Sequence, residues 1–312
     1  MSERRVPKIL YKYRPFNERT ISALIGDKLF FADPATFNDP LDTSPHLKPD
    51  ISAQELKSAL RTLVEERVSS EMKSAAKATK LKGPKTQKHI ENHSIKQANI
   101  TIERISYDAE NPEYNEIDDP LKFLLAGELE YELLRRYNKG VFSMSAKATC
   151  PLMWSHYGDQ HRGVAIGYSI PKDCRDRLHK VVYGGSRVLS ANSVVSMMNG
   201  NIKAQEQVDE TVLLRKAKSW SYECEWRLLD RRGLQDSDLE LKSVVFGLRC
   251  PDTIRYSIIK SLENRKPNVE FREIRQNPSY FSLNNSNLEI DELMIGYPRN
   301  VRSVCEGFYS IN

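Results

Sequence analysis

The pattern of apolar residues constrains the fold of this 312-residue chain most strongly, because its period changes repeatedly along the sequence. Segments that alternate and are rich in β-branched and aromatic residues, such as 8–14, 221–230 and 269–276, predict strands. Segments with apolar residues at helical spacing, such as 119–138 and 251–266, predict helices. Strands and helices in this irregular order are typical of α+β proteins rather than of a βαβ repeat. We therefore expect a mixed, mostly antiparallel sheet core with surrounding helices.

Residues 51–118 differ in character from the rest of the chain. Their first half is amphipathic and rich in lysine, and the pattern breaks near Gly83 and Pro84. We predict one domain over residues 1–312 with a helical, lysine-rich insertion at 51–118. A solvated helical arm is the simplest interpretation of this insertion, and phosphate binding is a second one.

Composition argues against several classes of protein. No apolar run approaches the ~20 residues that span a bilayer, so we expect no membrane partner. No apolar segment of the signal-peptide kind precedes the first predicted strand, so we expect a cytoplasmic protein. The five cysteines are widely spaced and form no CxxC pair, and we predict neither a disulfide framework nor a metal site. The net charge of +5 fits a nucleic-acid or nucleotide partner without requiring one.

Three segments carry the side chains best suited to chemistry: residues 10–16, 140–170 and 219–229. The middle segment is the richest, because eight positions contain four hydrogen-bonding rings: Trp154, His156, Tyr157 and His161. A plain core helix does not need this density of polar rings. We predict that the three segments meet in one pocket.

The third segment contains the sequence YECEWR at residues 222–227. Alternation along a strand places Glu223, Glu225 and Arg227 on one face. Tyr222 and Trp226 then face the core. Two carboxylates on one face repel each other, which raises the pKa of one of them, as acid–base sites often require. A carboxylate can also stabilise an oxocarbenium-like centre. The alternative is a solvent-facing strand on which Arg227 pairs with a glutamate.

The first segment offers cations. Lys12 and Arg14 share one face of the predicted strand, where they could clamp a pyrophosphate, or they are exposed residues of an edge strand. The following FNDP sequence predicts a turn in which Asn38 caps backbone amides, and this loop could also line the rim of a site.

The middle segment offers aromatic and hydroxyl groups. Tyr157 suits the wall of a pocket that stacks on a planar base or nicotinamide. His156 and His161 are five residues apart, which is poor spacing for one metal ion on a helix. Ser143 and Ser145 share one face of their strand, where they could orient a ligand or form an outer sheet face. The alternative is an aromatic core with hydrogen-bonded histidines.

Several segments of the chain resemble, in their order, a bacterial family catalogued as a domain of unknown function. These segments are LYKYRPF, LFFADPATFNDPLD, FSMSAKATCPLMWSHYGDQHRGVAIGY and SWSYECEWRLL. Its signature is KYR, FNDP, MWxHY and WxxExEWR, and the resemblance covers most of the chain outside residues 51–118. The family is distantly similar to AbiGi-type abortive-infection proteins and, through them, to the ADP-ribosyltransferase fold. The chain departs from that fold in lacking an STS triplet and in carrying YKYR on its first strand.

The resemblance implies NAD as co-substrate. Lys12 or Arg14 would hold the dinucleotide, Ser143 or Tyr157 would lie beside the nicotinamide, and Glu225 would be the catalytic glutamate. The predicted catalytic residues are Glu225, Glu223 and Tyr157, and the predicted cofactor-binding residues are Lys12, Arg14, Ser143, His156, Asn38 and Arg227.

We therefore expect an NAD-dependent ADP-ribosyltransferase-like toxin or effector of bacterial anti-phage defence. It would modify nucleic acid or protein, with an antitoxin or another defence-system protein as a further partner. The alternative is a non-catalytic component that binds nucleic acid or senses phage. A nuclease ranks lower because the clustered Asp, Glu, His and Lys pattern of metal-dependent cleavage is missing.

Overall fold

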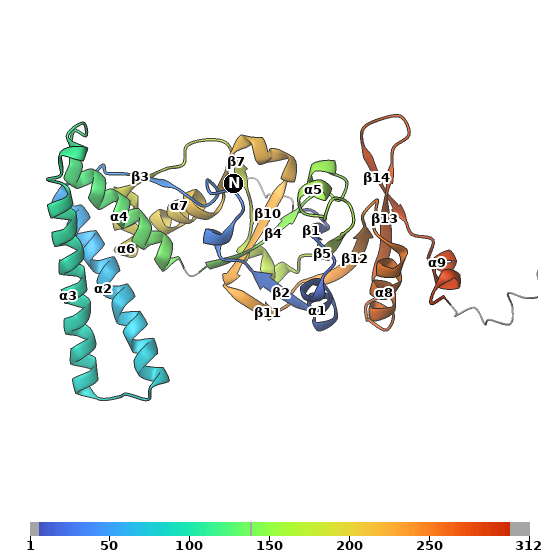
Figure 1. Ribbon diagram of the computed structural model, residues 1–312, viewed down its shortest axis with the longest axis horizontal. Helices are drawn as coiled ribbons and strands as arrows, with labels where there is room; N and C mark the ends of the chain where they lie inside the picture. Colours follow the sequence, from blue (N-terminus) through green and yellow to red (C-terminus); the bar gives the residue numbers. More distant parts are fainter. Residues whose placement is uncertain (1–5, 138, 300–312) are drawn as a thin grey trace, which may run out of the picture. The chain divides into compact units, whose positions relative to one another are not determined.

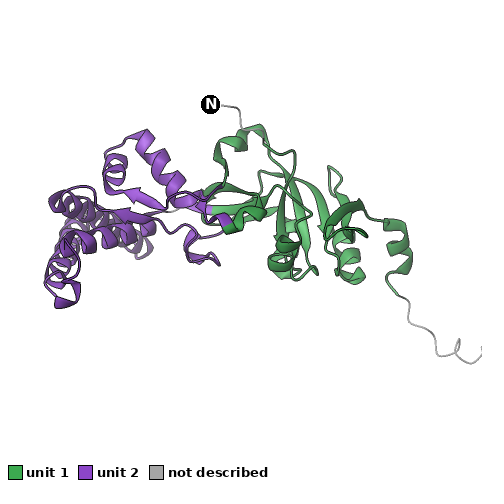
Figure 2. Cartoon of the chain, turned by 90° about the horizontal axis from the view of Figure 1, so that it is seen from above, with its two compact units in different colours: residues 1–31, 141–181, 219–312 green, residues 32–140, 182–218 purple. Residues whose placement is uncertain are grey.

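The chain forms two compact units in a computed structural model that describes residues 6–137 and 139–299 (Figures 1 and 2). Unit 1 comprises residues 1–31, 141–181 and 219–312, and unit 2 comprises residues 32–140 and 182–218. Each unit is therefore assembled from segments that lie far apart in the sequence.

Unit 1 is built on an eight-stranded sheet with the strand order β14-β13-β12-β5-β1-β4-β10-β6. Strands β12 and β13 pair in parallel, whereas the pairs β1–β4, β1–β5, β5–β12, β6–β10 and β13–β14 are antiparallel. The prediction of an α+β fold with a mostly antiparallel sheet is confirmed. The strands are β1 (Leu10–Arg14), β4 (Lys139–Ser145), β5 (Val164–Ser169), β6 (Leu178–Lys180), β10 (Glu225–Arg231), β12 (Glu240–Phe246), β13 (Glu270–Gln276) and β14 (Leu283–Asn287).

The two faces of this sheet carry two apolar clusters. The larger cluster contains Leu10 of β1, Phe142 of β4 and Trp226 of β10, together with Ile258 of helix α8. The smaller cluster contains Tyr13 of β1 and residues of β5 and β12. Because neighbouring residues of a strand point to opposite faces, the alternation in β1 separates these two clusters. The other elements of unit 1 are α1 (Glu18–Gly26), β2 (Lys28–Phe31), α5 (Pro151–His156), η3 (Lys172–Arg177), β11 (Gly233–Asp236), α8 (Asp252–Leu262) and α9 (Ile290–Gly296), and η4 (Lys218–Glu223) leads into β10.

Unit 2 is largely helical and holds two short pairs of parallel strands, β3–β8 and β7–β9. Its helices are α2 (Ala53–Ala78), α3 (Pro84–Asp108), α4 (Pro120–Arg136), α6 (Ala191–Met198) and α7 (Ile202–Leu213). Its strands and short helical turns are η1 (Pro34–Thr36), β3 (His46–Lys48), η2 (Pro112–Tyr114), β7 (Val182–Tyr183), β8 (Val188–Ser190) and β9 (Arg215–Lys216).

The residues predicted as a helical insertion form the hairpin of α2 and α3 (Figure 1). Ser52 and Glu55 form a capping box that begins α2. The base of α2 packs on α4, where Nε of Arg67 lies 2.7 Å from Oε2 of the buried Glu132. The helical pattern breaks where predicted, because α2 ends at Ala78 and α3 begins at Pro84, which suits the first turn of a helix.

One local prediction needs correction. The strand expected over residues 221–230 begins only at Glu225, because η4 precedes it and Cys224 has φ 45°. Helix α5, which carries Trp154, has six residues and ends at His156. The chain after residue 276 contains β14 and α9. Within the described ranges, no helix has both the length and the apolar character that crossing a membrane requires.

Candidate functional site

The start of β10 places two ionised groups inside unit 1. Glu225 and Arg227 lie on one face of the strand, and Trp226 lies on the other face in the larger apolar cluster. Nε of Arg227 is 2.8 Å from Oε1 of Glu225, and Nη2 is 3.1 Å from Oε2. The Arg227 side chain is 0% exposed and that of Glu225 is 5% exposed. This two-point contact fixes the plane of the carboxylate and supplies a counter-charge to a fully buried guanidinium.

A second buried carboxylate lies two residues earlier, at the end of η4. The phenol of Tyr157 donates a hydrogen bond of 2.8 Å to Oε1 of Glu223. The hydroxyl of Ser145 donates to the backbone carbonyl of Glu223 at 2.6 Å and accepts from the amide of Lys147 at 3.1 Å. Ser145 thus ties the end of β4 to the residue that carries the carboxylate.

Ser145 is a positioning residue that is absent from the predicted cofactor-binding residues, although it shares a strand face with Ser143. Ser143 was predicted from the same strand, and the structure places Ser143 half-buried, whereas Ser145 is 1% exposed. Both serines lie on one face of β4, so the alternation alone could not distinguish them. The hydrogen bond from Ser145 to the carbonyl of Glu223 depends on the helical turn η4, which the sequence pattern did not predict.

The backbone is held in unusual conformations at two places in this site. Cys224 lies between the two glutamates with φ 45°. Asp159, Gln160 and His161 have φ of 50°, 52° and 70°, so three successive residues are left-handed. Such conformations cost free energy for residues other than glycine and are found most often at functional sites.

The left-handed loop is fixed by close backbone contacts. The carbonyl of His161 accepts a 2.9 Å hydrogen bond from the amide of Arg249. A Cβ on Gly163 would lie 2.2 Å from the carbonyl oxygen of Arg14, so only glycine fits where this loop meets β1. Beside the loop, Trp154 is fully buried and donates a 2.8 Å hydrogen bond to the carbonyl of Ala148.

Lys12 lies on β1 with its ammonium 5.0 Å from the centroid of the Phe142 ring. Burial, assisted by the nearby charge of Arg14, lowers the pKa of Lys12 to about 7, while Glu225 and Glu223 act in the opposite direction. Burial also lowers the pKa of Arg14. A lysine of this kind can lose its proton near neutral pH, which an exposed lysine does not do.

The structure brings some of the predicted residues into contact and separates others. Tyr157, Glu223, Glu225 and Arg227 form two adjacent pairs in unit 1. Tyr11 is paired with Ser145 across β1 and β4, so Lys12 projects from the opposite face of β1. The expected clamp of Lys12 and Arg14 thus lies on the face of β1 that carries Leu10, not on the face of the serines.

The remaining predicted residues lie at the surface. His156 is exposed, with its ring 6.3 Å from that of Tyr157 and 6.4 Å from that of Tyr222, and we call these three rings the aromatic rim. Asn38 is exposed and belongs to unit 2. Among residues 6–137 and 139–299, no three His, Cys, Asp or Glu side chains gather as metal ligands would.

Comparison with known families relates this region to one of them. The model of a family described as "Protein of unknown function (DUF2971)" matches residues 153–228. The matched segment includes Tyr157, Glu223, Glu225 and Arg227, so the similarity covers both carboxylate pairs. The predicted relationship to a domain-of-unknown-function family is thus confirmed for this segment. No curated protein matches the chain, and no solved structure matches it.

Proposed function

We propose that unit 1 is an NAD-dependent ADP-ribosyltransferase-like enzyme that uses Glu223 and Glu225. The observation that carries this proposal is the pairing of two buried carboxylates with a phenol and a guanidinium at adjacent positions. Buried ionisable groups with specific partners mark functional sites more often than ordinary surface ion pairs do. The resemblance to abortive-infection proteins further supports a role as an effector in bacterial anti-phage defence.

The chemistry requires a carboxylate close to an anomeric carbon. The bond between ribose C1′ and the nicotinamide nitrogen breaks, and nicotinamide leaves with the electron pair of that bond. Glu225, oriented by Arg227, would stabilise the oxocarbenium-like ribose. The nucleophile of the acceptor then bonds to C1′ and gives its proton to a carboxylate, which releases it to solvent. The aromatic rim offers flat rings on which the nicotinamide can stack.

NAD consumption and transfer of a labelled ADP-ribose to RNA, DNA and protein acceptors test the proposal. We expect Glu225→Gln, which keeps the shape of the side chain, to lower the rate by at least about 100-fold. Glu223→Gln and Tyr157→Phe examine the second pair. Glu270→Gln, at an exposed position of β13, is the matched control and should leave the rate unchanged. A folded and fully active Glu225→Gln protein, or no NAD consumption with any acceptor, would contradict the proposal.

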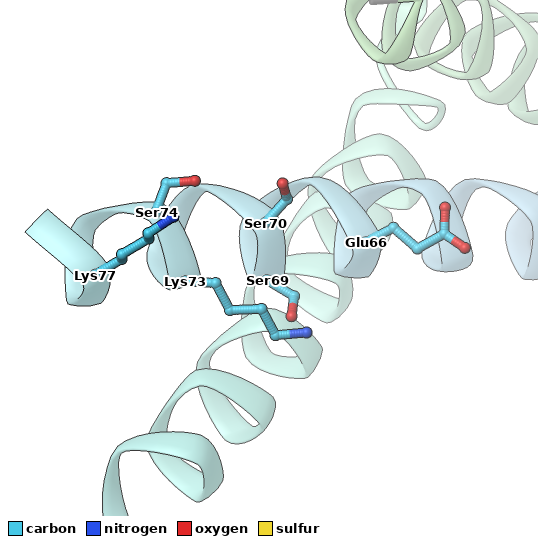
Figure 3. A pocket seen from close by; sticks show the side chains of 6 residues that line it. All are labelled: Glu66, Ser69, Ser70, Lys73, Ser74 and Lys77. Atoms are coloured by element: carbon cyan, nitrogen blue, oxygen red, sulfur yellow. The ribbon is translucent and has the colours of Figure 1, made fainter. Parts of the chain in front are cut away.

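A second function is favoured by the charge of the α2–α3 hairpin. Residues 72–90 around its turn contain no aspartate or glutamate and six lysines, namely Lys73, Lys77, Lys80, Lys82, Lys85 and Lys88. Two of these lysines, Lys73 and Lys77, line an open hollow of about 420 Å³ on α2 together with Ser69, Ser70, Ser74 and one acidic residue, Glu66 (Figure 3). A cluster of one sign of charge attracts the phosphates of nucleic acids.

The salt dependence of oligonucleotide binding tests this second function separately. For single-stranded nucleic acid, each neutralised phosphate contributes about 0.7 to the slope of log affinity against log salt. Replacing Lys80, Lys82 and Lys85 by glutamine should therefore reduce the slope by about 2. Lys172→Gln, which changes an exposed lysine of unit 1, is the control and should change the slope less. Binding that is absent at low salt, or unchanged in the triple variant, would refute this function, and neither result bears on NAD turnover.

A further inference from the structure

Unit 2 contains a concave site that the proposed enzyme chemistry does not use. A pocket of about 450 Å³ lies between the loop that precedes β3, the loop that joins β7 to β8, and strand β9. Ser44 contributes to it from the first loop, Gly185 and Arg187 from the second, and Arg215 and Lys216 from the strand. All of these residues belong to one compact unit.

The loop of residues 184–187 presents unpaired backbone donors. Gly184 and Gly185 have φ of 78° and 83°, which glycine adopts without steric cost. The amide of Gly184 donates to the carbonyl of Lys216 at 2.8 Å, whereas the amides of Gly185, Ser186 and Arg187 have no backbone or side-chain acceptor in the described part of the chain. A Cβ on Gly185 would meet no atom within 4 Å, so the backbone there faces open space. Successive free amides in a glycine turn are a common way to bind an anion.

Two cations reach the same loop. Nη1 of Arg215 donates to the carbonyl of Ser186 at 2.5 Å, and Nη2 lies 3.5 Å from Oε1 of Glu210, which holds the guanidinium at the pocket wall. Arg187 is exposed and has no acidic partner among the residues that the structure describes. Its positive charge is thus not neutralised by the protein there.

The floor of the site is held by a buried ion pair. Nζ of Lys216 lies 3.2 Å from Oδ2 of Asp42, and the two side chains are 5% and 2% exposed. This pair links the loop before β3 to strand β9, so the walls that carry Ser44 and Arg215 are held together. The half-buried hydroxyl of Ser44 makes no hydrogen bond within the described ranges and is available to a ligand.

From this arrangement we infer that the pocket binds the phosphate groups of a small phosphorylated molecule. Arg187 contributes a free charge, Ser44 a hydroxyl, and the loop of residues 184–187 its backbone amides, which together match the acceptor oxygens of a phosphate. The pocket volume lies in the range of small-ligand sites and exceeds what one phosphate needs, which favours a diphosphate or a phosphate ester.

Titration calorimetry of the full chain with inorganic pyrophosphate tests the inference. We expect one site per chain, and Arg187→Ala should weaken binding by about tenfold or more. Arg187→Lys should retain part of the affinity, because a lysine keeps the charge but loses the two-point contact. Ser44→Ala should weaken binding by a smaller factor, and Arg61→Ala, at an exposed position of α2 outside the pocket, should have no effect. Arg187 is exposed, so its variants should remain folded, which circular dichroism checks.

Two further ligands identify the source of the phosphate. ADP should bind in competition with pyrophosphate if the site accepts an organic diphosphate. A single-stranded oligonucleotide should not compete at physiological salt. The inference is overturned if pyrophosphate does not bind at millimolar concentration, if Arg61→Ala weakens binding as much as Arg187→Ala, or if only the oligonucleotide binds. None of these outcomes depends on NAD turnover by unit 1.

Discussion

Removing Arg227 from its contact with Glu225 is the most informative perturbation of unit 1. Arg227→Met keeps an apolar stem of similar length but removes the guanidinium. The variant thereby leaves the carboxylate of Glu225, which is 5% exposed, without two hydrogen bonds of 2.8 and 3.1 Å. The substitution creates only a small change in side-chain volume.

The expected loss of stability follows from that geometry. A hydrogen bond to a charged group contributes about 1.5–3 kcal/mol, and two such bonds are lost. Breaking a buried ion pair from one side costs about 3–5 kcal/mol in other proteins, because the remaining charge stays desolvated. We therefore expect the free energy of unfolding of unit 1 to fall by about 3–5 kcal/mol. The double variant Glu225→Gln/Arg227→Met should recover part of this loss, because it leaves no unpaired carboxylate at position 225.

Tryptophan fluorescence during urea unfolding reports on unit 1, which contains the Arg227–Glu225 pair. The three tryptophans of the chain, Trp154, Trp220 and Trp226, all belong to unit 1. Arg231→Met, at an exposed position of the same strand, is the matched control and should change the free energy of unfolding by less than about 0.5 kcal/mol. If Arg227→Met is as stable as the control, or if the double variant is less stable than the single one, the reasoning about this buried pair is refuted.

Three further predictions concern the surroundings of the site. Burial lowers the pKa of Lys12 to about 7 from its ordinary 10.5, so the unfolded chain binds one more proton than the folded chain between these pH values. The free energy of unfolding should therefore rise as pH increases from 7 towards 10. Lys12→Met should flatten that rise in unfolding curves measured across this range. Gly163→Ala places a Cβ 2.2 Å from a backbone oxygen of β1 and should lower the melting temperature or prevent folding. Its control, Gly127→Ala on the exposed face of α4, should stabilise that helix by up to about 1 kcal/mol. Equal effects of the two substitutions would contradict the reasoning. Ser145→Ala removes one buried and one partly buried hydrogen bond and should lower the free energy of unfolding by about 1–3 kcal/mol in urea. A neutral result would show that Ser145 does not position η4.

Several features of the fold could be predicted because they depend on local patterns. The helix at residues 18–26 follows from apolar residues at helical spacing, and the structure adds an Asn17 cap on the amide of Thr20. The strands β1 and β13 follow from alternating segments. The start of β10 could not be predicted in this way, because the left-handed Cys224 interrupts a segment whose composition is that of a strand.

The candidate site shows the same division. The residue types at positions 157, 223, 225 and 227 are enough to indicate a polar cluster from the sequence alone. Tertiary contacts decided which of these side chains form pairs. Tyr157 and Glu223 are 66 positions apart in the sequence and meet only where the end of α5 approaches η4. The placement of Lys12 on the opposite face of β1 likewise depends on the pairing of β1 with β4 and β5.

The sequence by itself determined the class of fold and the segments that contribute to the candidate site, because propensity, alternation and turn residues act over a few positions. Only the tertiary structure decided how residues 32–140 and 182–218 combine into one unit, and it alone revealed the ion pair of Asp42 and Lys216 in the pocket beside Arg187. These contacts join residues that are separated by more than a hundred positions. Their stability comes from burial and charge pairing in the folded chain, which no local pattern records.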